Sequence, residues 1–278
     1  MKVNDSLLKK EYEKIKKLYS QENYITSLEK ALVLIEKIKN SNNQELNFLC
    51  NFLIGDILRK RNNHFKALSY YKKTIEIANR ANLVNNDNIK FYDEEFNGNK
   101  LLANSFLRIG TEFFELEKND SAKYYFEKII DLPSLNKEII SIKASAYSNL
   151  SATYLKDSLF LKAKQYAFRA IEFHKKNNNT LSQSAALGNL ASIFLEEKMY
   201  KKAKEIYTEA IELIDKNNNI TAVKYKEDLY YNLAYTLYLL KDYSAYDYQE
   251  KSYLIKDDLR DREIKRIMTG AFEKHKID

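Results

Sequence analysis

Residues 147–154 (YSNLSATY), 187–194 (LGNLASIF) and 230–237 (YYNLAYTL) repeat one pattern at intervals of about forty residues. In each stretch an asparagine precedes a leucine, and a small residue follows. The first two stretches lead into a second segment with small or aromatic residues at helical spacing, namely Ala163, Ala167, Ala170 and then Ala203, Tyr207, Ala210. A fixed period of this size indicates stacked supersecondary units rather than one globular core.

The composition indicates an all-α fold. The chain of 278 residues contains only 5 glycines and 1 proline, whereas 45% of its residues are hydrophobic and 13% aromatic. Glycine and proline interrupt helices and form the turns between strands, so their scarcity favours long helices joined by short polar loops. The apolar content is sufficient for a continuous interior.

The units align on a small residue early in the second helix of each helical hairpin. These positions are Ser27, Ala67, Ala122, Ala163, Ala203 and, less well, Tyr246. About nine residues earlier stands a bulky residue, in turn Leu18, Leu58, Phe113, Tyr154, Phe194 and Leu237. Three residues before that, most units have another small residue: Gly55, Gly110, Ser151, Ala191 and Ala234. Small side chains are needed where two helix axes approach closely, so the pattern predicts paired helices.

These motifs resemble the tetratricopeptide repeat (TPR). The resemblance spans about Glu11 to Leu254 and is strongest at 144–214, although tryptophan is absent and the period exceeds the common 34 residues. It implies a right-handed TPR-like α-solenoid of about six antiparallel helical hairpins plus a C-terminal helix. We expect an array over 1–255, with hairpins near 6–38, 44–78, 100–131, 138–175, 181–215 and 224–255, and a capping or linker helix over 256–278.

Residues 79–100 interrupt the pattern between the second and third units. They add about fifteen residues, and a long connection is either functional or mobile. We expect an insertion that extends the neighbouring helix.

The formal charge of +7 does not by itself indicate nucleic acid. Lysine and glutamate alternate along most predicted helices, a pattern typical of solvated faces with ion pairs one turn apart. Cys50, the single cysteine, excludes an internal disulfide. The sequence has no apolar run long enough to span a bilayer and no signal-peptide core near its start. We therefore predict a cytoplasmic protein without membrane insertion, or a periplasmic one if a signal segment has been removed.

The sequence shows no pattern typical of an enzyme. His64, His174 and His275 are far apart, and distant repeats of a solenoid do not converge on one metal site. No phosphate-binding glycine loop, HExxH or GxSxG motif is present. We expect no catalytic residues, no metal and no cofactor.

Asn149, Asn189 and Asn232 share one register in three consecutive units. The TPR resemblance implies that the first helix of each hairpin lines a concave groove, where such asparagines hold the backbone of an extended peptide. A primary amide offers a donor and an acceptor together, which matches a peptide group. Arg108 occupies the same register and suits a carboxylate. The alternative is that the asparagines cap or bridge neighbouring helices. The predicted groove is completed by Ser192, Tyr231 and Tyr235.

Three functional hypotheses follow. The first is a non-enzymatic module that binds a protein or peptide ligand. Here the resemblance is to the sensory TPR regions of bacterial signalling regulators of the Bacteroidetes type, which precede a helix-turn-helix or kinase domain. The alternative is a scaffold that forms a homodimer through its convex face or terminal helices, using a stripe with Ile264, Ile267 and Phe272. Binding of a phosphate backbone by the positive surface is a third, weaker hypothesis.

Overall fold

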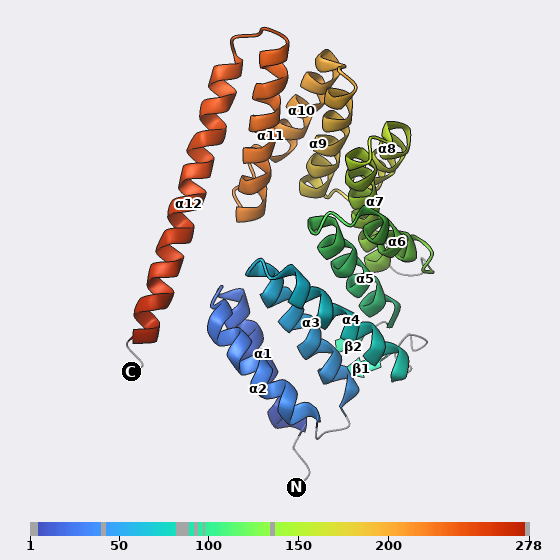
Figure 1. Ribbon diagram of the computed structural model, residues 1–278, viewed down its shortest axis with the longest axis vertical. Helices are drawn as coiled ribbons and strands as arrows, with labels where there is room; N and C mark the ends of the chain where they lie inside the picture. Colours follow the sequence, from blue (N-terminus) through green and yellow to red (C-terminus); the bar gives the residue numbers. More distant parts are fainter. Residues whose placement is uncertain are drawn as a thin grey trace. The chain divides into compact units, whose positions relative to one another are not determined.

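The protein is described by a computed structural model, which covers residues 5–39, 43–81, 89–91, 94–96, 98–133 and 137–275 (Figure 1). For 89–91, 94–96 and 270–275 only the backbone is described. The chain divides into two compact units, residues 1–146 and 147–278, and the boundary falls inside one helix.

The described residues of unit 1 form three helical hairpins and the start of a seventh helix. Its helices are α1 (Asp5–Ser20), α2 (Tyr24–Lys39), α3 (Gln44–Lys60), α4 (His64–Arg80), α5 (Gly98–Glu115), α6 (Asn119–Ile130) and the first half of α7 (Lys137–Lys156). Each hairpin buries the apolar stripe of its two helices, and α3 is the most extensively buried, with Ile54 and Ile57 fully inaccessible. The predicted pairing of helices is confirmed in this unit.

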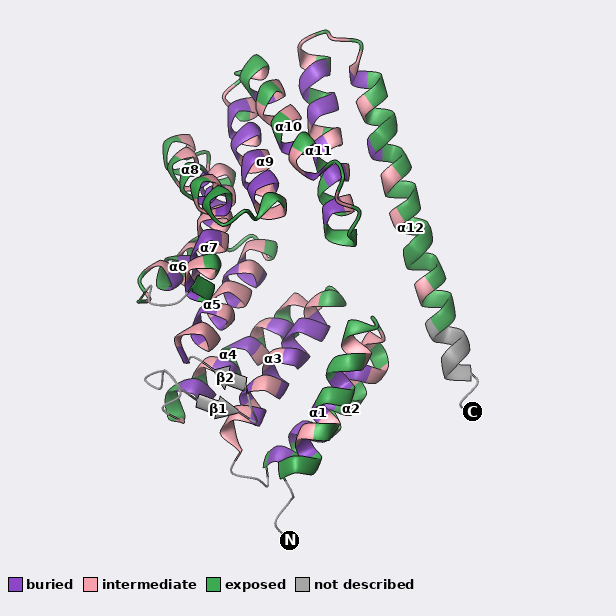
Figure 2. Ribbon diagram, turned by 180° about the vertical axis from the view of Figure 1, so that it is seen from behind, coloured by how far each residue is buried: buried purple, intermediate pink, exposed green. Residues whose placement is uncertain are grey.

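Unit 2 continues the same architecture over three further hairpins. It contains the second half of α7, then α8 (Phe160–Lys176), α9 (Thr180–Glu196), α10 (Tyr200–Ile214), α11 (Ile220–Leu239) and α12 (Ala245–His275). The buried side chains lie where consecutive helices face one another, as Figure 2 shows for α9 and α11. The described residues thus form an all-α fold of paired helices apart from two short strands.

The turn inside each hairpin has a recurring backbone conformation without glycine. One residue per turn has a positive φ between 56° and 62°, in chain order Glu22, Asn62, Glu117, Ser158, Lys198 and Lys241. The N–H of the next residue then bonds a carbonyl five residues back, for example Asn63 to Leu58 at 2.9 Å and Met199 to Phe194 at 2.8 Å. This is the helix-ending Schellman geometry, which satisfies carbonyls that the helix leaves free. The bulky residues identified in the sequence supply these carbonyls.

The aligned small residues lie in the contact between the two helices of each hairpin. Ala67, Ala122, Ala163 and Ala203 are fully buried. A Cβ added at Gly110 would lie 2.5 Å from a ring carbon of Phe126, so bulk on one helix fills the space left by a missing side chain on the other.

The sixth hairpin departs from the predicted alignment. Tyr246 is 71% exposed, whereas Ala245 is 9% exposed, so the small position is Ala245 and the alignment on Tyr246 is wrong by one residue. The physical reason is a tighter turn. The N–H of Ala245 bonds the carbonyl of Asp242, three residues back, whereas the N–H of Ala67 bonds that of Asn63, four residues back. Asp242 also accepts hydrogen bonds from the backbone N–H and the hydroxyl of Ser244.

The insertion between the second and third hairpins forms a β hairpin in its described part. Strand β1 (Ile89–Phe91) pairs antiparallel with β2 (Glu94–Phe96), and Ile89 stands opposite Phe96. We had expected these residues to extend a helix, but α4 ends at Arg80.

Helix α12 runs without a break from Ala245 to His275. The segment that we expected as a separate capping or linker helix therefore continues the second helix of the sixth hairpin. The residues of α12 are largely exposed up to residue 269, as the green colour of this helix in Figure 2 shows.

Candidate functional site

The three predicted asparagines lie on the first helices of three consecutive hairpins in unit 2. Asn149 is on α7, Asn189 on α9 and Asn232 on α11, and each is partly buried. The leucine after each asparagine points into the core, so the asparagine lies about 100° around the helix, at the margin between core and solvent. This position lets the amide reach either a neighbouring helix or a ligand.

Asn189 reaches a neighbouring helix. Its Nδ2 donates to the backbone carbonyl of Ser148 on α7 at 3.1 Å. This bond links α9 to α7 and agrees with the alternative interpretation, in which the asparagine bridges helices. The side chains of Asn149 and Asn232 form no hydrogen bond with any described residue, although their backbone carbonyls accept from Thr153 and Thr236.

Ser192 is engaged within its own hairpin. Its hydroxyl donates to the carbonyl of Gly188 at 3.0 Å and lies 2.8 Å from the hydroxyl of Tyr207. Tyr207 is fully buried, and burial raises its pKa to about 12. Ser192 therefore provides the polar partner that a buried phenol needs, which is a structural role.

Tyr231 and Tyr235 are about half exposed and lie one turn apart on α11. Both line a cavity of about 520 Å³ at the end of the sixth hairpin, together with residues of the turn and the first turns of α12. The structure therefore places these two predicted residues at a concave surface.

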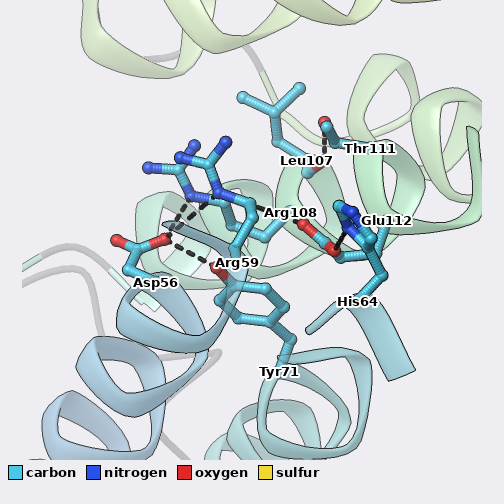
Figure 3. A network of polar contacts seen from close by, with 8 residues as sticks. All are labelled: Asp56, Arg59, His64, Tyr71, Leu107, Arg108, Thr111 and Glu112. Atoms are coloured by element: carbon cyan, nitrogen blue, oxygen red, sulfur yellow. Dashed lines mark hydrogen bonds and ion pairs between the residues drawn. The ribbon is translucent and has the colours of Figure 1, made fainter. Parts of the chain in front are cut away.

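Arg108 lies on α5 in unit 1, where it already has a carboxylate partner. Its Nε lies 2.9 Å from Oδ1 of Asp56 on α3 (Figure 3). Its guanidinium also stands over the ring of Phe52, 5.9 Å from the centroid. The carboxylate that the sequence suggested for Arg108 thus comes from the chain itself.

The same carboxylate belongs to a polar network that the sequence analysis missed. The hydroxyl of Tyr71 donates to Asp56 at 2.7 Å, and Figure 3 shows Arg59 beside Arg108 above this carboxylate. On α5, Oε2 of the fully buried Glu112 lies 2.8 Å from Nδ1 of His64.

Burial raises the pKa of Glu112, because the ionised form loses solvation. Its second oxygen has no hydrogen-bond partner in the part of the chain that the structure describes and lies 3.9 Å from Nε of Arg59. The network joins the second hairpin to the third. An acid within the apolar stretch 109–114 (IGTEFF) was the available sequence signal.

The sequence analysis also missed two lysines, each of which stands six residues before one of the asparagines. In unit 1, Lys143 donates to the carbonyls of Ile130 and Leu132 at the end of α6. In unit 2, Lys226 donates to the carbonyl of Asp215 at the end of α10. Each lysine, on the first helix of one hairpin, thus satisfies carbonyls at the end of the preceding hairpin.

The described residues contain neither a membrane-spanning helix nor a metal-binding cluster. No helix among them is long and apolar enough to cross a membrane. No group of three or more histidine, cysteine, aspartate or glutamate side chains in the same residues could hold a metal ion.

Paired helices with close-packed small residues and a recurring turn define a TPR-like α-solenoid. Residues 184–217, which include most of α9 and all of α10, match the tetratricopeptide repeat family. The predicted TPR resemblance and the predicted fold class are confirmed by this match and by the solved structures below. A search of curated protein sequences found no match.

Several solved structures share the fold. The crystal structure of BtubC (BKLC) from P. vanneervenii has a TM-score of 0.63 at 13% identity, covering 86% of this chain and 92% of that chain. The apo form of RapI has a TM-score of 0.63 at 11% identity, with coverages of 89% and 74%. Aspartyl phosphate phosphatase F from Bacillus subtilis has a TM-score of 0.63 at 14% identity, with coverages of 87% and 68%. At these identities the likeness establishes the fold, which is typical of protein-interaction scaffolds.

Proposed function

We propose that the chain is a peptide- or protein-binding module and that it serves as the sensory or scaffold part of a bacterial signalling or transcriptional regulator. The binding surface is the first-helix face of unit 2, formed by α7, α9 and α11. The TPR repeat at 184–217 supports the general role. The regulator context rests on the sequence resemblance described above.

The amides of Asn149 and Asn232 carry the proposal. Both are partly buried, and neither has a protein partner among the described residues. Neither amide is among the buried polar atoms of the described residues that lack a partner, so both are accessible and can offer a donor and an acceptor to a peptide group. Asn189 shows that an amide in this register can hold a backbone carbonyl, because it binds that of Ser148.

The test compares two sets of variants against peptides selected from a random display library. Asn149→Ala/Asn232→Ala is expected to keep the thermal stability of the wild type and to weaken binding at least tenfold, as the loss of two hydrogen bonds implies. Asn189→Ala is the matched control. It is expected to lower stability, since the link from α9 to Ser148 is lost, and to change affinity less. Selected peptides that bind the double variant as tightly as the wild type would place binding on another surface.

A self-associating scaffold remains the second candidate because of one observation on α12. Ile264, Ile267 and Met268 are 47%, 60% and 53% exposed and lie within one turn of each other. Phe272, the third residue of the predicted stripe, lies outside the residues whose side chains are described. Light scattering should show a dimer that Ile264→Glu/Ile267→Glu converts to a monomer. A wild type that is monomeric at all concentrations would exclude this candidate.

A further inference from the structure

The cavity at the end of the sixth hairpin is walled by tyrosine. Five tyrosines line it: Tyr231, Tyr235, Tyr238, Tyr243 and Tyr246. Each is at least half exposed, and their side chains come from α11, from the turn and from the first turn of α12. The remaining lining includes Lys241, Asp242 and Gln249.

This tyrosine cavity differs from the face that an internal repeat presents to the next hairpin. The residue before Asn189 is Gly188, and a Cβ added there would lie 2.9 Å from Cδ2 of Leu229 on the following hairpin. Gly188 therefore leaves room for the side chain of Leu229. Tyr231 occupies the same register before Asn232, but it is 55% exposed. Its ring is therefore accessible to a partner.

Within the described residues, the rings of the cavity have no cation stacked on them, unlike Tyr147 and Tyr248 of unit 2. Arg169 lies 5.8 Å from the ring centroid of Tyr147, and Lys251 lies 4.8 Å from that of Tyr248. Among the described residues, no lysine or arginine stands over any of the five cavity tyrosines in this way. Aromatic faces carry negative potential and attract cations, with arginine the more frequent partner.

The border of the cavity adds negative charge. An adjacent shallow pocket shares Tyr246 and Gln249 with it and is lined by Asp247 and Glu250 on α12. Neither acid forms an ion pair with a described residue. Lys241 is the one unpaired cation that lines the two pockets within the described residues.

The carboxylate of Asp242 already has partners within the chain. Hydrogen bonds from Ser244 and from Lys204 lower its pKa to about 2. The two unpaired acids Asp247 and Glu250 therefore outnumber the unpaired Lys241, in a chain whose overall charge is +7.

We propose that the tyrosine cavity binds an arginine side chain of the partner segment, with the guanidinium stacked on the rings and its charge facing Asp247 and Glu250. This inference rests on the proposed peptide-binding function and specifies one side chain that the partner carries. Arginine suits the site better than lysine because its planar group stacks on aromatic faces and is more weakly hydrated.

The probe is a fluorescein-labelled peptide with arginines separated by glycine–serine pairs. Its control is the same peptide with citrulline, a neutral isostere, in place of each arginine. Fluorescence anisotropy at physiological salt should show binding of the arginine peptide and at least tenfold weaker binding of the citrulline peptide. Equal affinity for both peptides, or no binding of the arginine peptide, would overturn the inference.

Variants test whether the arginine binds at this cavity, and they distinguish the contribution of the aromatic rings from that of the acidic side chains. Tyr235→Phe keeps the ring and should bind like the wild type, whereas Tyr235→Leu keeps apolar bulk, removes the ring and should weaken binding about tenfold. Asp247→Asn/Glu250→Gln should weaken binding and reduce its salt dependence. Tyr124→Leu, at an equally exposed tyrosine of unit 1, is the control. Unchanged binding by Tyr235→Leu would place the arginine elsewhere.

The two proposals fail separately. Library peptides that depend on Asn149 and Asn232 but show no arginine preference would leave the peptide-binding function intact and refute the arginine site. Loss of asparagine dependence together with tyrosine-dependent arginine binding would refute the groove and retain the cavity.

Discussion

Gly110→Ala tests the close packing on which the hairpin architecture depends. In a helix interior, alanine is better than glycine by about 0.5–1 kcal/mol, so the change alone would stabilise α5. The added Cβ, however, would lie 2.5 and 2.7 Å from two ring carbons of Phe126, which is fully buried. Overpacking of this kind costs about 1–3 kcal/mol. We therefore expect a net loss of stability of about 1 kcal/mol.

Gly188→Ala is the matched control. Its added Cβ would meet only the terminal Cδ2 of Leu229, at 2.9 Å, and a flexible leucine can move aside. The helix propensity then dominates, and we expect this variant to gain about 0.5 kcal/mol.

Urea unfolding followed by circular dichroism and tyrosine fluorescence measures both variants; the chain has 22 tyrosines and no tryptophan. In Gly110→Ala/Phe126→Leu the smaller side chain should relieve the clash, so the double variant should be more stable than the two separate losses predict. A Gly110→Ala protein as stable as the wild type would refute the packing argument.

Three further predictions concern stability. Ala163→Glu places a charge in a fully buried helix contact and should lower stability by several kcal/mol, measured by thermal melting; an unchanged melting temperature would contradict the alignment. Lys226→Met keeps the apolar stem but removes the donor to the carbonyl of Asp215, and urea unfolding should show a loss of about 1–2 kcal/mol. Burial lowers the pKa of His174 below its ordinary value of 6.5, so the folded chain binds this proton more weakly than the unfolded chain. The stability that neutral His174 contributes is therefore present above about pH 6.5 and lost as the pH falls below it, and His174→Gln should flatten melting temperature against pH in that range.

The alignment on small residues was predictable because every hairpin needs a small side chain where its two helices approach closely. Ala67, Ala122, Ala163 and Ala203 are buried as expected, since close helix axes exclude larger side chains wherever they occur. The error at Tyr246 arose because the turn after Asp242 is tighter than in the other hairpins, with the N–H of Ala245 bonded to a carbonyl three residues back instead of four, and this moves the buried position one residue earlier. The strands β1 and β2 were missed because three-residue strands carry too short a pattern to distinguish from a helix.

The site was less predictable than the fold. Register placed Asn149, Asn189 and Asn232 correctly on the first helices of their hairpins. It could not show that Asn189 binds Ser148, because the two residues are 41 positions apart and meet only through helix stacking. The partner of Arg108 was hidden for the same reason, since Asp56 belongs to another hairpin.

The sequence by itself determined that the chain is helical and that the helices pair in hairpins of about forty residues. It also determined where small residues allow the paired helices to approach closely. These properties follow from local periodicity, which sets the buried face of each helix. Only the tertiary structure decided which polar groups are satisfied internally and which stay open. It paired Arg108 with Asp56 and Ser192 with Tyr207, and it gathered five tyrosines around one cavity. It also left the amides of Asn149 and Asn232 without a partner among the described residues. Such partners depend on distances of a few ångströms between residues on different helices, and one-dimensional spacing does not contain those distances.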